Sequence, residues 1–458
     1  MPQPLKKIVK DIQPSGEINL TADLSKADTN DSSDYKLIVQ CLGNSATLKQ
    51  FPYPLKDVTG TLIITTDSIK LDNISASVAD NIHIAPNAST IKLNGQINLR
   101  NKAFDTGSFR ISANDVLFDQ RLAFALPERV RQLYLALSPT GSFDLNLNYL
   151  KMLKTDDGDN YIDFTGSAKV KPAYFKISGA TIQLDAVLKT QGLYITGDGF
   201  YNGNVNISAD TMRINGKTLT DFKADIIYDP LNRIWSSENI FADCYTGKVI
   251  GKCDFKKSEI APMQYSLQVG FKNIDLKQFL SDNVGNSRPK GHTTGKMSGS
   301  INLNAAVGQN HSRIGVCTLT ATDMQVGKPS PLARLLAVLS LTETKDFIFE
   351  TMLVDSYIKD DRMSFKKFDL SGKSLAFTGS GYLDLITHNI DLILTARGQR
   401  LATAKPSILE SLTEGIGAAV VRMEVTGPYY DPKVETKPLP ILTDPLRILG
   451  SKPDEQNH

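Results

Sequence analysis

The sequence of 458 residues lacks the features that indicate a nucleic-acid-binding or membrane-spanning protein. Lysine and arginine (51) nearly balance aspartate and glutamate (49), so no field of one sign favours nucleic acid as a partner. No apolar run reaches the roughly 18 residues that a membrane-spanning helix needs. The N-terminus also lacks the apolar segment of a secretory signal.

Catalytic motifs and metal-binding clusters are missing as well. No two of the five histidines lie within four residues of each other, and no GxSxG, HExxH or P-loop pattern occurs. The four cysteines show no CxxC spacing, although Cys244 and Cys253 are close enough in sequence to pair across a hairpin. A role as small buried apolar residues fits them equally well. We therefore predict no enzymatic activity, no cofactor and no metal site.

Tryptophan is scarce, with a single copy, but glycine is plentiful, with 32. Many of these glycines follow Asn, Asp or Thr, and such steps are typical of the tight turns that join antiparallel strands. An apolar content of 41% suffices for a continuous buried surface. The composition and length predict a mainly β protein of about three domains.

A repeated landmark supports this division. The stretch that begins at Gly16 returns at Gly141 and, less completely, at Gly299, and each copy opens a strand of alternating apolar and polar residues. Recurrence at domain-sized spacing predicts one β architecture extended lengthwise. A second shared passage lies in mid-unit, where residues 55–58 (LKDV) resemble residues 219–222 (LTDF).

The alternation predicts one apolar and one polar side for each strand, because successive side chains of a strand point to opposite faces. Such strands, stacked in register, form a ribbon whose apolar face must be covered or curled on itself. We therefore predict an elongated, repeated β-sheet curled into an apolar groove, with a few short helices at the repeat ends. The residues expected to line the groove and bind lipid are Ile18, Leu20, Phe143, Leu145, Leu147, Val205, Ile207, Ile301, Leu303, Leu392 and Leu394.

The predicted units are a first β repeat over residues 1–140, a second over 141–298 and a third over 299–436. A Pro-rich and then charged tail, residues 437–458, is expected to be poorly ordered.

The clearest predicted helix covers residues 332–341 and follows a proline at its first turn. About ten residues give only ~15 Å of helix, too little to span a membrane. We expect it to lie at the end or rim of the groove, or to face a membrane; a helix buried in an ordinary core is the alternative. Its apolar residues, spaced i, i+3, i+4 and i+7, are Leu332, Leu335, Leu336 and Leu339.

The third unit resembles the C-terminal domain of AsmA-like proteins, a bacterial cell-envelope family that includes TamB. The resemblance covers residues 295–436 and rests on the order of four motifs. These are a strand at 315–319, the short apolar helix at 332–341, a Gly-rich strand pair that starts at 377, and a closing V-x-G-x3-D-P-x-V at 425–434.

This resemblance implies a groove-shaped β-sheet in the periplasm that carries phospholipid from the inner toward the outer membrane and supports outer-membrane biogenesis. It also implies an inner-membrane anchor, an N-terminal helix that this chain lacks. Residues 5–16 resemble the internal passage 126–141, and both predict a short helix before a repeat. We therefore expect an upstream part and anchoring in the full-length form.

The expected partners are phospholipid and proteins of the inner and outer membranes or the envelope, without nucleic acid. The alternative is a structural or adhesive β-solenoid of the cell envelope, whose apolar face is sealed by its own packing. The sequence does not indicate the oligomeric state, the lipid species or the direction of transfer.

Overall fold

The described strands form one open antiparallel sheet of 22 strands, accompanied by three short helices. The prediction of a mainly β protein is confirmed. The computed structural model describes residues 12–25, 34–49, 51–78, 89–101, 103–155, 158–177, 180–196, 199–256, 262–282, 293–307, 309, 311–326, 347–372, 375–398, 419–429 and 431–438.

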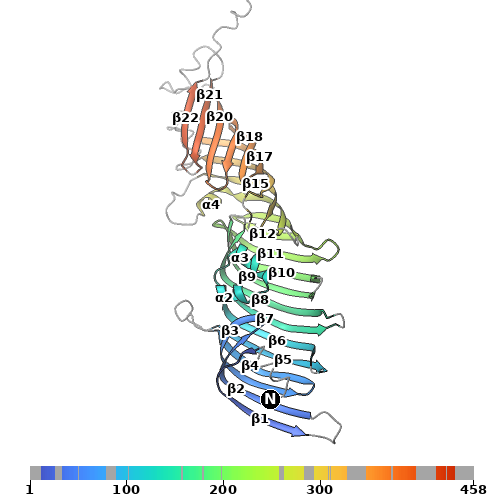
Figure 1. Cartoon of the computed structure of the whole chain (residues 1–458). Coiled ribbons are helices and arrows are strands. Elements are labelled where there is room, and N and C mark those ends of the chain that lie inside the picture. Colours follow the sequence, from blue (N-terminus) through green and yellow to red (C-terminus); the bar gives the residue numbers. More distant parts are fainter. Residues whose placement is uncertain are drawn as a thin grey trace, which may run out of the picture. The chain divides into compact units, whose positions relative to one another are not determined.

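Two compact units divide the chain, and the first fourteen strands belong to unit 1. They follow one another in sequence order across the sheet (Figure 1), each paired antiparallel with the next. Their bounds are β1 (Ile18–Ser25), β2 (Asp34–Leu48), β3 (Phe51–Thr65), β4 (Ser68–Val78), β5 (Thr90–Arg100), β6 (Ala103–Leu117), β7 (Ser142–Lys154), β8 (Asn160–Ile177), β9 (Ala180–Ile195), β10 (Gly199–Ile214), β11 (Lys217–Asp229), β12 (Ile234–Cys244), β13 (Gly247–Lys256) and β14 (Gln264–Asp275).

Unit 2 holds the last six strands, which also pair antiparallel in sequence order. Strands β15 (Thr294–Ala306) and β16 (Ile314–Val326) contribute residues to both units. The three repeat units stay a prediction, because a sequence repeat need not fold as a separate compact unit. The strands of unit 2 are β17 (Phe347–Lys359), β18 (Arg362–Gly372), β19 (Leu375–Asp384), β20 (Asn389–Gly398), β21 (Ala419–Pro428) and β22 (Lys433–Pro438).

Two-residue turns close several of the hairpins. Strands β10 and β11 join through Asn215-Gly216, and both residues have a positive φ, of 49° and 79°. The turns at Tyr245-Thr246 and Asp360-Asp361 use the same left-handed backbone. Turns of this kind match the twist of antiparallel strands, which explains the abundance of Asn and Asp beside glycine.

The repeated mid-unit passage is a β-bulge with a left-handed aspartate. Asp57 has a φ of 52° at a register shift in β3, and Asp221 has a φ of 51° at a shift in β11. Asp115 in β6 and Asp323 in β16 adopt the same backbone, with φ of 55° and 53°. A bulge bends its strand and increases the local twist, so these positions shape the sheet.

Two helices lie between β6 and β7, at the predicted repeat junction. Helix α2 (Gln120–Ala125) begins at Asp119, whose carboxylate accepts a hydrogen bond from the backbone N–H of Leu122 at 2.9 Å. Helix α3 (Glu128–Leu137) follows Pro127 and ends at Ser138, in the left-handed conformation. The short helix expected near residue 126 is therefore present.

Helix α4 (Leu276–Ser281) follows β14, and Asp275 caps it by accepting a hydrogen bond from the N–H of Gln278 at 2.8 Å. Within the described part of the chain, none of the helices has the length and apolar character needed to cross a membrane. The predicted helix 332–341, with Leu332, Leu335, Leu336 and Leu339, lies outside the described residues. So does the predicted tail beyond β22.

Candidate functional site

One face of the unit 1 sheet carries apolar side chains from strand to strand; we call it the apolar face. Residues directly opposite each other on paired strands share a face. Leu20 of β1 lies opposite Val39 of β2, which lies opposite Leu62 of β3, and Leu62 lies opposite Leu71 of β4. The first four strands therefore turn their apolar residues to the same side.

The apolar face continues through the middle strands. Leu71 lies opposite Gly95 of β5, and Gly95 lies opposite Phe109 of β6. Phe109 pairs with Leu150 of β7, and Leu150 pairs with Phe164 of β8. Leu147 and Leu150 are three residues apart, so strict alternation would place them on opposite faces. A register shift after Leu147 in β7 breaks the alternation, and both residues lie opposite alternate residues of β6, on the same face.

The remaining strands of unit 1 extend the face to β14. Phe164 lies opposite Gly192 of β9, which lies opposite Gly203 of β10, and Val205 and Ile207 follow Gly203 by alternation. From Ile207, successive cross-strand pairs continue the apolar face through β11, β12 and β13 to β14. The predicted residues that this register brings to one face are Ile18, Leu20, Phe143, Leu145, Leu147, Val205 and Ile207.

Solvent reaches this face. Leu20 is 57% exposed and Ile18 is 49% exposed, because β1 has a partner on one side only among the described strands. Phe143, Leu147 and Ile207, on interior strands, are half-buried. Half-buried apolar side chains over so many strands leave a large apolar surface without a complete protein cover.

Helix α2 covers part of the apolar face beside β6 and β7. Leu122 and Ala125 of α2 are buried in a cluster with Val116 of β6, and Phe143 and Leu145 pack against that cluster. The ring of Phe118 lies 4.9 Å from that of Phe143. Two of the predicted groove residues therefore serve, at least in part, as ordinary core.

The predicted residues of unit 2 lie on a face that is closed to solvent. Leu392 is opposite Val425, and Leu394 is opposite Met423. Leu394 is 0% exposed, and Met423 and Val425 are also fully buried. In β15, Ile301 and Leu303 are half-buried. Both belong to unit 1.

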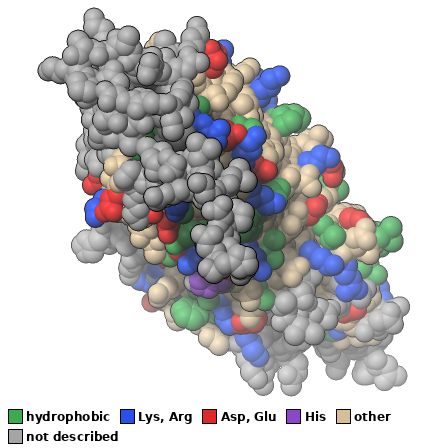
Figure 2. All heavy atoms as spheres, turned by 90° about the horizontal axis from the view of Figure 1, so that it is seen from above, with side chains coloured by type: hydrophobic (Ala, Val, Ile, Leu, Met, Phe, Trp, Pro, Cys, Tyr) green, Lys and Arg blue, Asp and Glu red, His purple; other side chains and the backbone are tan. Residues whose placement is uncertain are grey.

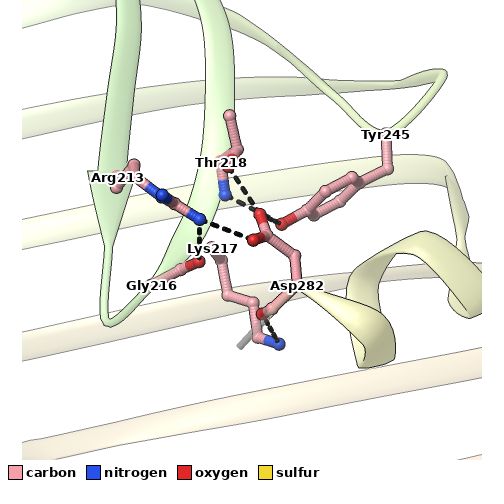
Figure 3. Close-up of polar contacts among 6 residues, drawn as sticks. All are labelled: Arg213, Gly216, Lys217, Thr218, Tyr245 and Asp282. Carbon is pink, nitrogen blue, oxygen red and sulfur yellow. Dashed lines mark hydrogen bonds and ion pairs between the residues drawn. The ribbon is translucent and has the colours of Figure 1, made fainter. Parts of the chain in front are cut away.

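A polar network joins the turns at one end of β10–β13, as Figure 3 shows. The Asp282 carboxylate accepts hydrogen bonds from Arg213 Nη2 and Thr218 Oγ1, each at 2.5 Å, and from the hydroxyl of Tyr245. Lys217 Nζ donates to the backbone carbonyl of Asp282 at 2.7 Å. The network fixes two hairpin turns relative to the residue that follows α4.

The charged form of Asp282 is favoured in this network. Burial acts to raise the pKa of Asp282, but the hydrogen bonds from Thr218 and Tyr245 and the charge of Arg213 outweigh it, so the pKa lies below its usual value. Burial and the bond to Asp282 raise the pKa of Tyr245 to about 12. Elsewhere, Figure 2 shows cationic and anionic side chains interspersed on the described part of the face seen from above.

The cysteines form no disulfide. Cys244 lies opposite Gly247 and Cys253 lies opposite Ser237, so the pairing considered from the sequence is not made. Burial raises the pKa of both thiols to about 11, which keeps them protonated and unreactive at neutral pH.

Sequence reasoning missed one group of residues on the apolar face. Six consecutive strands, β9 to β14, each carry an aromatic residue at the same strand end; we call this group the aromatic row. Its members flank hairpin turns in pairs, and that spacing is the signal that could have revealed them. The aromatic row consists of Tyr194, Phe200, Tyr228, Trp235, Phe255 and Tyr265.

The comparisons with known proteins identify no relative. No protein-family model matches the chain, and neither the curated proteins nor the solved structures contain a significant match. The AsmA-like resemblance therefore stays a prediction from sequence motifs.

Proposed function

We propose that the apolar face of unit 1 curls into a groove that binds the acyl chains of phospholipids and carries them between bacterial membranes. The observation that supports this proposal is the continuity of half-buried apolar residues from β1 to β14. Acyl chains supply the cover that such a face needs, and each buried methylene is worth about 0.8 kcal/mol.

The bulges support the curled shape. Asp57, Asp115 and Asp221 each place a left-handed residue inside a strand of unit 1. Bulges are a principal means by which β-sheets bend. A bent sheet shields lipid tails on its concave side while the headgroup stays in water.

Transfer in this proposal needs no catalytic step. A lipid diffuses along a continuous apolar track because each position offers similar burial to its tails. The AsmA-like motif order supports placing the protein in the periplasm, anchored at the inner membrane in its full-length form, with envelope proteins as partners and outer-membrane biogenesis as the process served.

A structural role is the second candidate, and unit 2 favours it. Leu394, Met423 and Val425 are fully buried, so this part of the apolar face of unit 2 leaves no surface for a ligand. A sealed sheet of this kind is what an envelope scaffold or adhesin requires.

A pair of charges placed in the proposed track tests the function. Leu147 and Leu150 are half-buried on the apolar face and lie outside the cluster covered by α2. Leu147→Asp with Leu150→Arg forces passing tails against ionic groups, at a cost of several kcal/mol. We expect native mass spectrometry and lipid extraction to find phospholipid in the parent protein and much less in this double variant.

The matched control puts the same charges on the other face of the same strand. Asn146 and Asn148 are exposed, so Asn146→Asp with Asn148→Arg should retain the lipid of the parent. A parent that carries no lipid, and extracts none from phosphatidylglycerol vesicles, contradicts the proposal and favours the scaffold.

A further inference from the structure

The aromatic row is continuous from strand to strand. The rings of Tyr194 and Phe200 lie 5.2 Å apart, and the Phe200 ring lies 5.1 Å from Trp235. Tyr228 lies opposite Trp235 with ring centroids 5.2 Å apart, and Trp235 lies opposite Phe255. These contacts place one aromatic ring on each strand along a single rim of the apolar face.

Glycines make room for this packing. A side chain at Gly203 would come within 2.3 Å of the Trp235 ring, so the indole lies directly over the glycine backbone. Phe164 covers Gly192 in the same way. The indole of Trp235 therefore packs against the backbone of the sheet, and the Phe200 ring meets it edge-on, at an interplanar angle of 81°.

The polar tips of the row are available to a ligand. Tyr194, Tyr228 and Trp235 are half-buried. Among the described residues, their hydroxyl and indole N–H groups form no side-chain hydrogen bond. Tyr and Trp combine an apolar body with a polar tip, and for that reason they concentrate where hydrocarbon meets lipid headgroups.

The opposite ends of the same strands have a different chemistry. Leu219, which is half-buried, lies there on the apolar face, opposite the buried Met212. Beyond them lies the Asp282 network, in which the cationic groups of Arg213 and Lys217 already bond to Asp282. A lipid phosphate would have to displace Asp282 to use them, whereas aliphatic side chains suit the ends of acyl chains.

We propose that the aromatic row holds the glycerol and headgroup region of a bound phospholipid, whose acyl chains extend across the apolar face toward Leu219 and Met212. The inference rests on the proposed lipid-binding function and adds an orientation to it. Each strand of β9–β14 carries an aromatic residue at one end and aliphatic residues beyond it. This order matches that of a phospholipid, in which the headgroup region is followed by the acyl chains.

Trp235 tests this orientation without any mutation, because it is the single tryptophan of the chain. The purified protein is loaded with phosphatidylglycerol that carries bromine atoms near the glycerol end, at the middle or near the methyl end of one acyl chain. Bromine quenches a neighbouring indole. We expect the largest loss of Trp235 fluorescence with bromine near the glycerol end and the smallest with bromine near the methyl end.

A matched variant moves the reporter to the other end of the strands. Trp235→Phe combined with Leu219→Trp should reverse the order, with the methyl-end bromine quenching most. An equal or inverted order in the parent overturns the orientation. Bound lipid, shown by extraction, that quenches Trp235 at no bromine position also overturns it but leaves the proposed function intact. If no lipid binds at all, the proposed function itself is wrong.

Discussion

Two leucines on the apolar faces of the two units share a local structure but differ in their exposure. In unit 1, Leu147 lies opposite Gly166, and a Cβ on that glycine would come within 2.7 Å of the leucine side chain. In unit 2, Leu394 covers Gly379 in the same manner, at 2.5 Å. Yet Leu147 is half-buried and Leu394 is 0% exposed.

This difference teaches that alternation sets the side to which a residue points, but not whether that side is closed. Cross-strand pairing is local and follows from period-two patterning and register. Closure depends on what lies over the face. Our proposal places ligand binding in unit 1 and a structural role in unit 2, and the predictions below test that division.

Truncating the two matched leucines should give the largest difference in stability between the two units. Leu394→Ala leaves a cavity in a closed core, so we expect unit 2 to lose about 2–5 kcal/mol of stability. Leu147→Ala removes a half-exposed side chain, so unit 1 should lose only about 1 kcal/mol. Hydrogen exchange in increasing urea, followed at β19–β20 and at β7–β8, measures both. Equal losses would show that the two faces are equally closed.

The same contrast explains how much the sequence could predict. Ile18, Leu145 and Ile207 share a face because the apolar pattern shifts together with each bulge, so the sequence pattern was sufficient to place them. The closure over Leu394 was not predictable, because burial arises from contacts distant in sequence.

The Asp282 network shows this limit even more clearly. Arg213 and Asp282 are 69 residues apart, and no local motif links them. The aromatic row needed the exact pairing of six strands, although its members flank turns that were recognisable. The lipid-binding role of the predicted residues stays a prediction.

Removing the carboxylate of Asp282 should weaken unit 1 at its strand ends. We expect Asp282→Asn to cost about 2 kcal/mol at neutral pH, because a partly exposed carboxylate then loses charged hydrogen bonds from Arg213 and Thr218. Asp243→Asn is the control, since Asp243 pairs with Lys248 at the surface and should matter little. Urea unfolding followed by Trp235 fluorescence measures both variants.

The contribution of Asp282 to stability should depend on pH in a defined direction. The pKa of Asp282 is lower in the folded protein than in the unfolded chain. Its stabilisation is therefore complete above the unfolded value of about 4 and is lost as the pH falls through the folded value. The gap between parent and Asp282→Asn should shrink in acid. A constant gap would mean that the carboxylate charge is not what stabilises the turns.

The left-handed aspartates of the strands should behave alike in both units, because they have the same backbone conformation. A β-branched residue in the left-handed region costs about 1–2 kcal/mol, so Asp221→Val in unit 1 and Asp323→Val in unit 2 should each lose that amount. Asp221→Gly and Asp323→Gly keep the conformation and should change stability little. Urea titration with hydrogen exchange at β11 and β16 measures all four. A cost confined to one unit would show that the bulge is not a shared device.

The two terminal strands of the described sheet provide the smallest and most specific test. Strand β22 is short and carries Lys433, Glu435 and Pro438, which discourage edge-to-edge pairing, whereas β1 presents exposed Leu20 and Leu24. Leu20→Lys should alter stability by less than about 0.5 kcal/mol, since the side chain is largely in solvent. It should nevertheless reduce concentration-dependent self-association, measured by sedimentation velocity, because a lysine on β1 repels a second strand. Glu435→Lys on β22 should leave self-association unchanged, as that edge is already charged. If Leu20→Lys has no effect on association, β1 does not act as an open edge.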